Sequence, residues 1–299
     1  MNRTMKTGLL VGLVLGLCVT STTMAQQPPP MGLTTPPKQE KNEFTGAVDG
    51  RLGFGQVDED VFMTVNVGTA MRWGQLGWGI QVPLRFRIND EAPKDSSVIR
   101  KEDWDEVSDW TRVIRFVEWG SEKKPEPVYA RLGVLNGITL GHGTIVDRYY
   151  NVIDADHYQT GVFVKTDLGV AGGSFFMDNM IDPEIVGVRG MIRPLTFGKW
   201  GEFYDRFTVG VTLVGDTQAP REPKYASGGD ERRINGDGDL MVNTEPLWLF
   251  GFDLGWKVIE TEQFALTPYA DLNVMGATRG TGFHTGLLAT IQAGQSVTF

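Results

Sequence analysis

The sequence has very little cysteine, and Cys18 is its single example. Residues 1–25 have the pattern of a secretory signal peptide, because Arg3 and Lys6 precede an apolar run and small residues lead up to Ala25. We therefore expect cleavage after Ala25, which removes Cys18. The mature chain then has no disulfide, no thiolate metal site and no cysteine nucleophile.

A lipoprotein signal is the alternative reading of the same segment. Such a signal would be cut before Cys18, and it needs a small residue at the preceding position. Leu17, which stands there, is bulky. The sequence favours a cleaved secretory peptide over a lipid anchor.

Long apolar runs and an excess of positive charge are also missing. No run of about eighteen or more apolar residues follows Ala25, so no helix is expected to span a membrane. Removing Arg3 and Lys6 from the 28 basic residues leaves 26 against 37 acidic residues, a net charge of −11. This balance argues against nucleic acid as a partner. Residues 26–42 are rich in proline and polar groups and predict an extended periplasmic lead-in.

The sequence does contain a repeated alternation of apolar and polar residues. In 75–90, "QLGWGIQVPLRFRIND", every even position from Leu76 to Ile88 is apolar, while the odd positions include Arg85 and Arg87. Successive side chains of a strand point to opposite faces, so this segment predicts a strand with one apolar and one polar face. The apolar face would meet a core in a soluble sandwich and lipid in a membrane barrel.

The same alternation predicts about twelve strands along the mature chain. They cover 44–54, 61–73, 75–90, 111–119, 128–135, 160–166, 170–176, 185–193, 207–215, 247–258, 264–274 and 283–299. An even number of strands places both ends of a bacterial barrel on one side of the membrane. We expect an all-β fold over 43–299, a transmembrane antiparallel up-and-down β-barrel.

The connections between these segments alternate in length. Short turns are expected at 74–75, 120–127, 168–169, 194–205 and 259–263, and the longer loops at 55–60, 89–110, 136–159, 178–184, 216–246 and 276–281. Aromatic residues gather where strands meet the short turns: Phe44, Trp73, Trp78, Trp119, Trp256, Phe264 and Phe299. Outer-membrane barrels have short periplasmic turns, long extracellular loops and such aromatic girdles.

The last segment ends in Phe299, with Val297 and Ile291 in phase behind it. In these features the chain resembles Gram-negative outer-membrane β-barrel proteins of the porin-like type, although no family-specific motif accompanies the pattern. The resemblance implies a place in the bacterial outer membrane, in contact with its lipid and lipopolysaccharide. It also implies that the barrel-assembly machinery recognises the strand ending at Phe299. A secreted soluble sandwich remains open as the alternative.

The polar phase of the strands would line the lumen of such a barrel. Its charged members are Arg72, Arg85, Arg87, Arg115, Arg131, Arg189, Asp253 and Asp271. The strand at 111–119 can be read in two phases. We expect Ile114 and Phe116 to face lipid, because the other phase would place Arg115 in the membrane at a cost of about 2–4 kcal/mol.

The order of the strands suggests a function for these charges. In a closed barrel of about twelve strands, Arg115 and Arg131 would face Asp253 and Asp271 across the lumen. In this the chain resembles general diffusion porins, whose basic and acidic walls produce a transverse field across a wet pore. With the arginine-lined lumen, the resemblance implies a narrow channel for small polar or anionic solutes. The alternative is that the charges pair and close the lumen, which would leave a non-conducting structural barrel.

The loop at 140–159 concentrates His142 and His157 near Asp147, Asp154 and Asp156. Such a cluster could bind a metal or act as acid and base in a lipid-modifying hydrolase. The loop has no serine, and its histidine spacing matches no zinc signature, so we expect no enzyme. A loop of this length could equally fold inward and narrow the pore.

The segment 235–245, "NGDGDLMVNTE", places Asn235, Asp237 and Asp239 at every second position, as in calcium-binding loops. Leu240 stands where the usual glycine would be, and Glu245 lies one position short of the usual bidentate acid. A solvated acidic loop is favoured over a calcium site, and no other cofactor is expected. The acidic stretch 89–109 is expected to be plain surface.

Overall fold

The computed structural model describes residues 44–57, 60–90, 97–105, 107–121, 126–152, 158–225, 232–234, 240–261, 263–276 and 280–291. The predicted signal peptide and lead-in lie outside these ranges. So do His157, Phe299 and the candidate calcium ligands Asn235, Asp237 and Asp239. In the part of the chain that is described, no helix is both long and apolar enough to cross a membrane.

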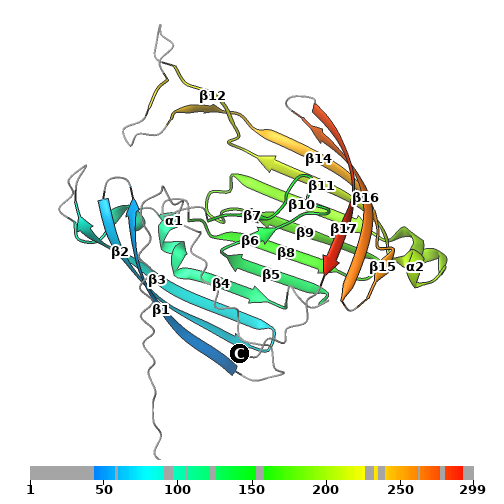
Figure 1. The fold of residues 1–299 in the computed structure, drawn as a ribbon, viewed down its shortest axis with the longest axis horizontal. Helices are drawn as coiled ribbons and strands as arrows, with labels where there is room; N and C mark the ends of the chain where they lie inside the picture. The colour runs from blue at the N-terminus through cyan, green and yellow to red at the C-terminus, as the bar shows by residue number, and fades with distance from the viewer. Residues whose placement is uncertain are drawn as a thin grey trace, which may run out of the picture.

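The described residues form 17 strands and almost no helix. Twelve of the strands follow one another through an antiparallel sheet (Figure 1): β1 (Phe44–Val57), β2 (Asp60–Trp73), β3 (Leu76–Asn89), β4 (Ile114–Trp119), β5 (Val128–Gly133), β8 (Gly161–Asp167), β9 (Ala171–Met177), β10 (Ile185–Ile192), β11 (Phe207–Asp216), β14 (Leu247–Trp256), β16 (Phe264–Met275) and β17 (Gly280–Ile291). The short β15 (Ile259–Glu260) also pairs with β16.

The remaining elements belong to connections. Two small hairpins lie in the longer loops, β6 (Asn136–Ile138) with β7 (Tyr149–Tyr150) and β12 (Pro220–Pro223) with β13 (Val242–Thr244). The helical turns are η1 (Lys101–Asp103), α1 (Val107–Trp110), η2 (Thr111–Val113), η3 (Pro194–Gly198) and α2 (Glu202–Asp205). None of them interrupts the order of the sheet.

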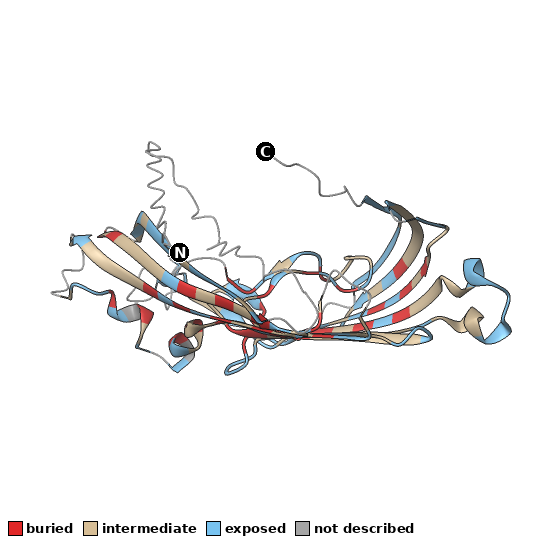
Figure 2. Cartoon of the chain, turned by 90° about the horizontal axis from the view of Figure 1, so that it is seen from below, coloured by how far each residue is buried: buried red, intermediate tan, exposed pale blue. Residues whose placement is uncertain are grey.

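The prediction of an all-β fold with sequential antiparallel strands is confirmed. Each of the twelve expected strands has its counterpart in the sheet, and consecutive strands pair as neighbours. Within the described ranges, however, β1 pairs only with β2 and β17 only with β16, so the sheet has two edges and no closed barrel is observed. Figure 2 shows the sheet as a trough whose two ends rise on the same side.

The sheet buries its charged face and exposes its apolar face, which is the opposite of a soluble sandwich. On β2 the buried positions include Phe62, Ala70 and Arg72, whereas Val67 and Trp73 on the opposite face are exposed. We call the face that carries Arg72 the inner face and the opposite one the outer face. A soluble sandwich would instead bury its apolar face and expose its charges.

An ion pair shows how strongly the inner face is curved. Arg115 on β4 donates to Asp49 on β1 at 2.8 Å, with β2 and β3 lying between them. In a flat sheet β1 and β4 would be about 14 Å apart, because neighbouring strands are spaced by about 4.8 Å. The curvature shortens this gap on the inner face, which is therefore the concave one.

A β-bulge in β4 makes its side chains face differently from the prediction. Gly79 of β3 pairs with Phe116 and Ile80 pairs with Ile114, so Arg115 is an extra residue between two registers. Such an insertion shifts the alternation of side chains by one position. The expectation that Ile114 and Phe116 share one face is wrong.

The bulge places Phe116 on the inner face together with Arg115. The Phe116 ring is 2% exposed and lies 5.2 Å from the guanidinium carbon of Arg131. Val117 is exposed on the outer face. Arg115 points inward as expected, and no charged residue of β4 lies on the outer face, because Glu118 is buried on the inner one.

Aromatic residues line the turn end of the outer face. Phe44 pairs with Trp73, Trp73 with Leu76, and Leu76 with Trp119, which gives one continuous row across β1 to β4. Phe44, Trp73 and Trp119 are all exposed. In the second half of the sheet, Trp256 on β14 pairs with Phe207 on β11 at the same turn end.

Candidate functional site

The inner face of β1–β5 carries a buried network of charges. Glu118 accepts hydrogen bonds from Arg72 on one carboxylate oxygen and from Arg131, at 3.1 Å, on the other. Arg115 forms its separate pair with Asp49. These groups are mostly buried, and burial of a charge is tolerated only with such partners.

A second charged cluster surrounds Asp103, which is 0% exposed. Three guanidinium groups meet its Oδ1 atom: Arg85, Arg100 at 3.0 Å and Arg112 at 3.3 Å. Arg112 also pairs with Asp109, which is buried as well. The expectation of a plain surface for 89–109 is therefore wrong at Asp103 and Asp109, because this segment returns to the sheet and supplies partners for it.

The other half of the sheet repeats the pairing of charges. Arg189 on β10 holds both carboxylate oxygens of Asp253 on β14, across the intervening β11. Arg87 at the far end of β3 pairs with Asp60 at 2.8 Å. Of the eight charges predicted to face the lumen, Asp271 contacts His142, and each of the other seven has a carboxylate or guanidinium neighbour.

The connection between β5 and β8 folds onto the inner face. We call residues 134–160 the inner loop, of which 134–152 and 158–160 are described. Its buried apolar residues and those of the sheet form one cluster: Leu135, Ile138, Leu140 and Val146 from the loop, and Tyr129, Phe163, Phe176 and Val214 from the strands. Burial of these side chains holds the loop against the sheet.

His142 fixes the inner loop to β16. Its Nδ1 atom lies 2.8 Å from Asp271 Oδ1, and its ring stacks on Tyr269 at 4.5 Å between centroids. The ring also lies against β14, where a Cβ atom on Gly255 would come 2.6 Å from His142 Nε2. A small cavity of about 10 Å³ beside His142, Asp253 and Asp271 has room for about one water molecule.

Tyr158 fixes the other end of the inner loop to β3. Its hydroxyl accepts a hydrogen bond from Gln81 Nε2, and its ring lies 5.8 Å from the guanidinium carbon of Arg112. Burial raises the pKa of Tyr158 to about 12, so this hydroxyl stays protonated. The inner loop therefore contacts both halves of the sheet, from β3 to β16. This arrangement corresponds to the alternative in which the loop at 140–159 folds inward.

Comparisons with protein-family models, with curated proteins and with solved structures gave no match to this chain. Function is therefore inferred from side-chain geometry alone.

The opposed walls expected from the sequence have a different local arrangement. Arg115 and Arg131 have their contacts with Asp49 and Glu118, on their own side of the sheet. Asp253 contacts Arg189, and Asp271 contacts His142. The partners Glu118, Asp103, Arg100 and Arg112 were missed, because they lie at a bulge or in a loop where the alternation gives no signal.

The residues of the inner loop that could serve chemistry are separated. His142 lies against Asp271, while Asp147 contacts Thr139 and Arg148. Within the described ranges, no three His, Asp or Glu side chains are grouped as a metal site would need. The position of His142 is explained by its contacts with β14 and β16.

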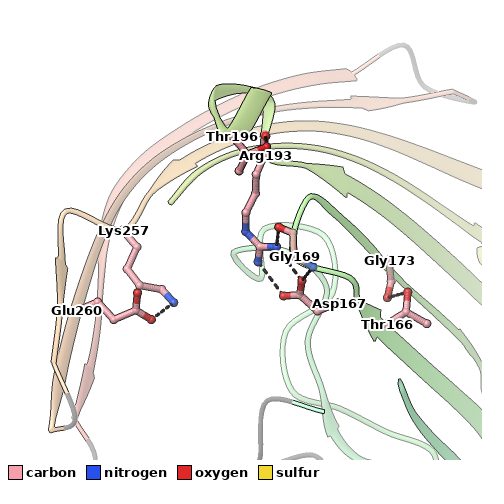
Figure 3. A network of polar contacts seen from close by, with 8 residues as sticks. All are labelled: Thr166, Asp167, Gly169, Gly173, Arg193, Thr196, Lys257 and Glu260. Atoms are coloured by element: carbon pink, nitrogen blue, oxygen red, sulfur yellow. Dashed lines mark hydrogen bonds and ion pairs between the residues drawn. The ribbon is translucent and has the colours of Figure 1, made fainter. Parts of the chain in front are cut away.

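The turn end of the inner face is not filled. A hollow of about 490 Å³ lies there, and we call it the turn-side hollow. Its lining residues come from β8, β11, β15 and β16, from the connection between β10 and β11 that contains α2, and from the residue after β14: Asp167, Arg193, Glu202, Asp205, Arg206, Thr208, Lys257, Glu260 and Thr267. Figure 3 shows two of its ion pairs, Arg193 with Asp167 and Lys257 with Glu260. Lys257 follows Gly255 by two positions, so the hollow adjoins the site of His142.

The anchor at Tyr158 gives a first testable prediction. We expect Tyr158→Phe to lower the free energy of unfolding by about 1 kcal/mol, because Gln81 loses a buried hydrogen-bond partner. Urea unfolding of the folded protein would measure the change. Tyr150→Phe is the matched control, since Tyr150 lies in the same loop and is exposed. Equal stability of the two variants would mean that Tyr158 does not anchor the loop.

Proposed function

We propose that this chain is a bacterial outer-membrane β-barrel that forms a narrow channel for small polar or anionic solutes. The observation that supports the proposal is the burial pattern of the two faces of the sheet. Charged side chains are buried on the inner face, and apolar side chains are exposed on the outer face. Exposed apolar residues lie on β1 to β3 and on β10, β11, β14, β16 and β17: Val48, Leu52, Val67, Ile80, Val82, Val188, Val211, Phe250, Phe252, Leu272 and Phe283. Lipid is the solvent that suits such a face.

Closure of the barrel would join β1 to β17. Both are long edge strands, of 14 and 12 residues, and each exposes one row of backbone groups. Edges of this length are rarely left open, since they pair with other chains. Twelve sequential antiparallel strands place β1 and β17 in opposite directions, so they can pair directly. Both edges also rise on the same side of the trough (Figure 2).

The inner face supports a narrow channel in preference to a wide one. The inner loop crosses it, and the turn-side hollow leaves space beyond that crossing. Among the ion pairs of the described residues, guanidinium groups outnumber carboxylates in both clusters near β3–β5. Arg72, Arg115 and Arg131 are set against Asp49 and Glu118; Arg85, Arg100 and Arg112 are set against Asp103 and Asp109. A positive excess in a confined lumen favours anions.

A non-conducting barrel is the second candidate, and the local pairing of charges favours it. Arg189 is held by Asp253, and the cavity beneath His142 has room for only about one water molecule. In that case the inner loop would close the lumen. In either form, lipid, lipopolysaccharide and the assembly machinery that reads a C-terminal aromatic are the proposed partners.

Single-channel recording in planar bilayers tests the proposal. We expect conductance with a preference for anions that increases at low salt, because screening of the arginine charges is then weakest. The double variant Arg115→Glu with Arg131→Glu should shift the reversal potential toward cations. The control pair, Arg221→Glu with Arg232→Glu, makes the same change of charge in the hairpin region of β12 and should shift it less.

Two results decide between the candidates. Protein that inserts, migrates as a folded species on unboiled gels and shows no conductance would assign the non-conducting barrel. Equal shifts from the inner and the hairpin pairs would mean that ions do not pass near Arg115 and Arg131.

A further inference from the structure

One carboxylate of the turn-side hollow serves two cations. Lys257 Nζ lies 2.6 Å from Glu260 Oε1, as Figure 3 shows, and Arg206 Nε lies 3.2 Å from Glu260 Oε2. Hydrogen bonding from Lys257 holds the pKa of Glu260 below its ordinary range, so Glu260 stays charged. The two cations together carry one positive charge more than Glu260 can balance.

A neighbouring pair leaves no spare charge. Arg193 donates to both carboxylate oxygens of Asp167, at 2.7 Å each, and to the carbonyl of Gly169 at 2.6 Å (Figure 3). Such a bidentate pair is rigid and nearly neutral as a unit. Arg193 and Asp167 both line the hollow, and as a neutral pair they have no charge left over for a ligand. The spare donors belong to Lys257 and Arg206, for which the described residues provide no further hydrogen-bond acceptor.

The opposite charge lies on α2. Glu202 and Asp205 both line the hollow, and neither has an ion-pair partner among the residues the structure describes. Asp205 Oδ1 is buried without a hydrogen-bond donor from the described chain. The carboxylates of Glu202 and Asp205, which line the hollow without a cationic partner from the described chain, therefore suit a cationic group that arrives with a ligand.

We propose that the turn-side hollow binds a small zwitterionic solute of the size of an amino acid or a dipeptide. The carboxylate of the solute meets Lys257 and Arg206, and its ammonium group meets Asp205 and Glu202. The inference rests on the proposed function, in which the hollow is the part of the lumen beyond the inner loop. It goes further by assigning a class of solute.

Size and charge both favour this class. A volume of about 490 Å³ falls within the usual range for small-molecule sites, about 300–1,000 Å³. A simple anion would satisfy Lys257 and Arg206 but would leave Glu202 and Asp205 without a cationic partner. A simple cation would leave the excess charge beside Glu260. Only a ligand that carries both charges satisfies both ends.

Diglycine is the probe for the experiment. Calorimetric titration of the folded full-length protein in micelles should show binding of diglycine. N-acetyl-diglycine, which lacks the ammonium group, should bind about tenfold more weakly. Lys257→Gln and Asp205→Asn should each weaken diglycine binding by about tenfold or more. Lys165→Gln is the matched control, because Lys165 lies on β8 outside the lining of the hollow. Its binding should equal that of the unmodified protein.

The outcomes separate this site from the channel. Conductance without diglycine binding would remove the site and leave the channel in place. Diglycine binding that Lys257→Gln and Asp205→Asn weaken, in a barrel that does not conduct, would support the site and remove the channel. Binding that neither variant changes would overturn the assignment to this hollow.

Discussion

Val211→Arg should lower the free energy of unfolding of the membrane-folded protein by about 2–4 kcal/mol, the cost of an arginine at the lipid face of a barrel strand. Val211 lies near the middle of β11, paired with Gly190 on one side and Phe252 on the other, and its side chain is 53% exposed. In water the same change would alter the free energy of unfolding by no more than about 0.5 kcal/mol, because the exposed side chain of Val211 makes few stabilising contacts. Urea unfolding from lipid vesicles measures the difference.

Val107→Arg provides the matched control. Val107 is 75% exposed and lies on α1, outside the strands of the sheet. Its replacement should leave the stability within about 0.5 kcal/mol of the unmodified protein. If Val211→Arg were equally harmless, the outer face would not meet lipid, and a soluble assembly would have to cover it.

Gly255→Leu should raise the conductance by about twofold or more, because it displaces His142 and the adjoining part of the inner loop from β14 and β16. The first carbon of any side chain at this position would come 2.6 Å from His142 Nε2 and 3.0 Å from Thr208 Oγ1. Both distances are shorter than an ordinary van der Waals contact, so a leucine side chain and the His142 ring cannot occupy their present places together. The larger side chain therefore displaces His142, and the contact with Asp271 is lost.

The control places the same side chain where there is space. A Cβ atom at Gly190 would have no neighbour within 4 Å, and Gly190 lies on the outer face of β10. Gly190→Leu should leave the conductance unchanged. His142→Ala is a second route to the same result, because it removes the contact with Asp271 without adding bulk. Unchanged conductance in both Gly255→Leu and His142→Ala would show that the inner loop does not limit ion flow.

The order of the strands was predictable from the sequence because the alternation of side chains is a local property. Arg85 and Arg87, two positions apart on β3, both point to the inner face, as their spacing requires. The short turn at Gly74 and Gln75 joins β2 to β3 as expected. Such features need only one segment of the chain to be read at a time.

The partners of the charges could not be read in this way. Glu118 lies three residues after Arg115, the extra residue of the bulge, which reverses the apparent facing of the strand. Asp103 reaches Arg85 only because a loop returns to the sheet, and loops have no periodicity that would reveal it. Distant contacts of this kind depend on the curvature of the whole sheet.

The path of the inner loop also sets an order of assembly. Tyr158 is separated by 77 positions from Gln81, and His142 by 129 positions from Asp271. Contacts between residues so far apart form late, because the closure of long chain segments costs entropy that neighbouring hairpins do not require. The hairpins of β1 to β3 join neighbouring segments, whereas the contact of His142 with Asp271 cannot form before β16 takes its place in the sheet. The part of the inner loop around His142 should therefore gain protection from hydrogen exchange later than these hairpins.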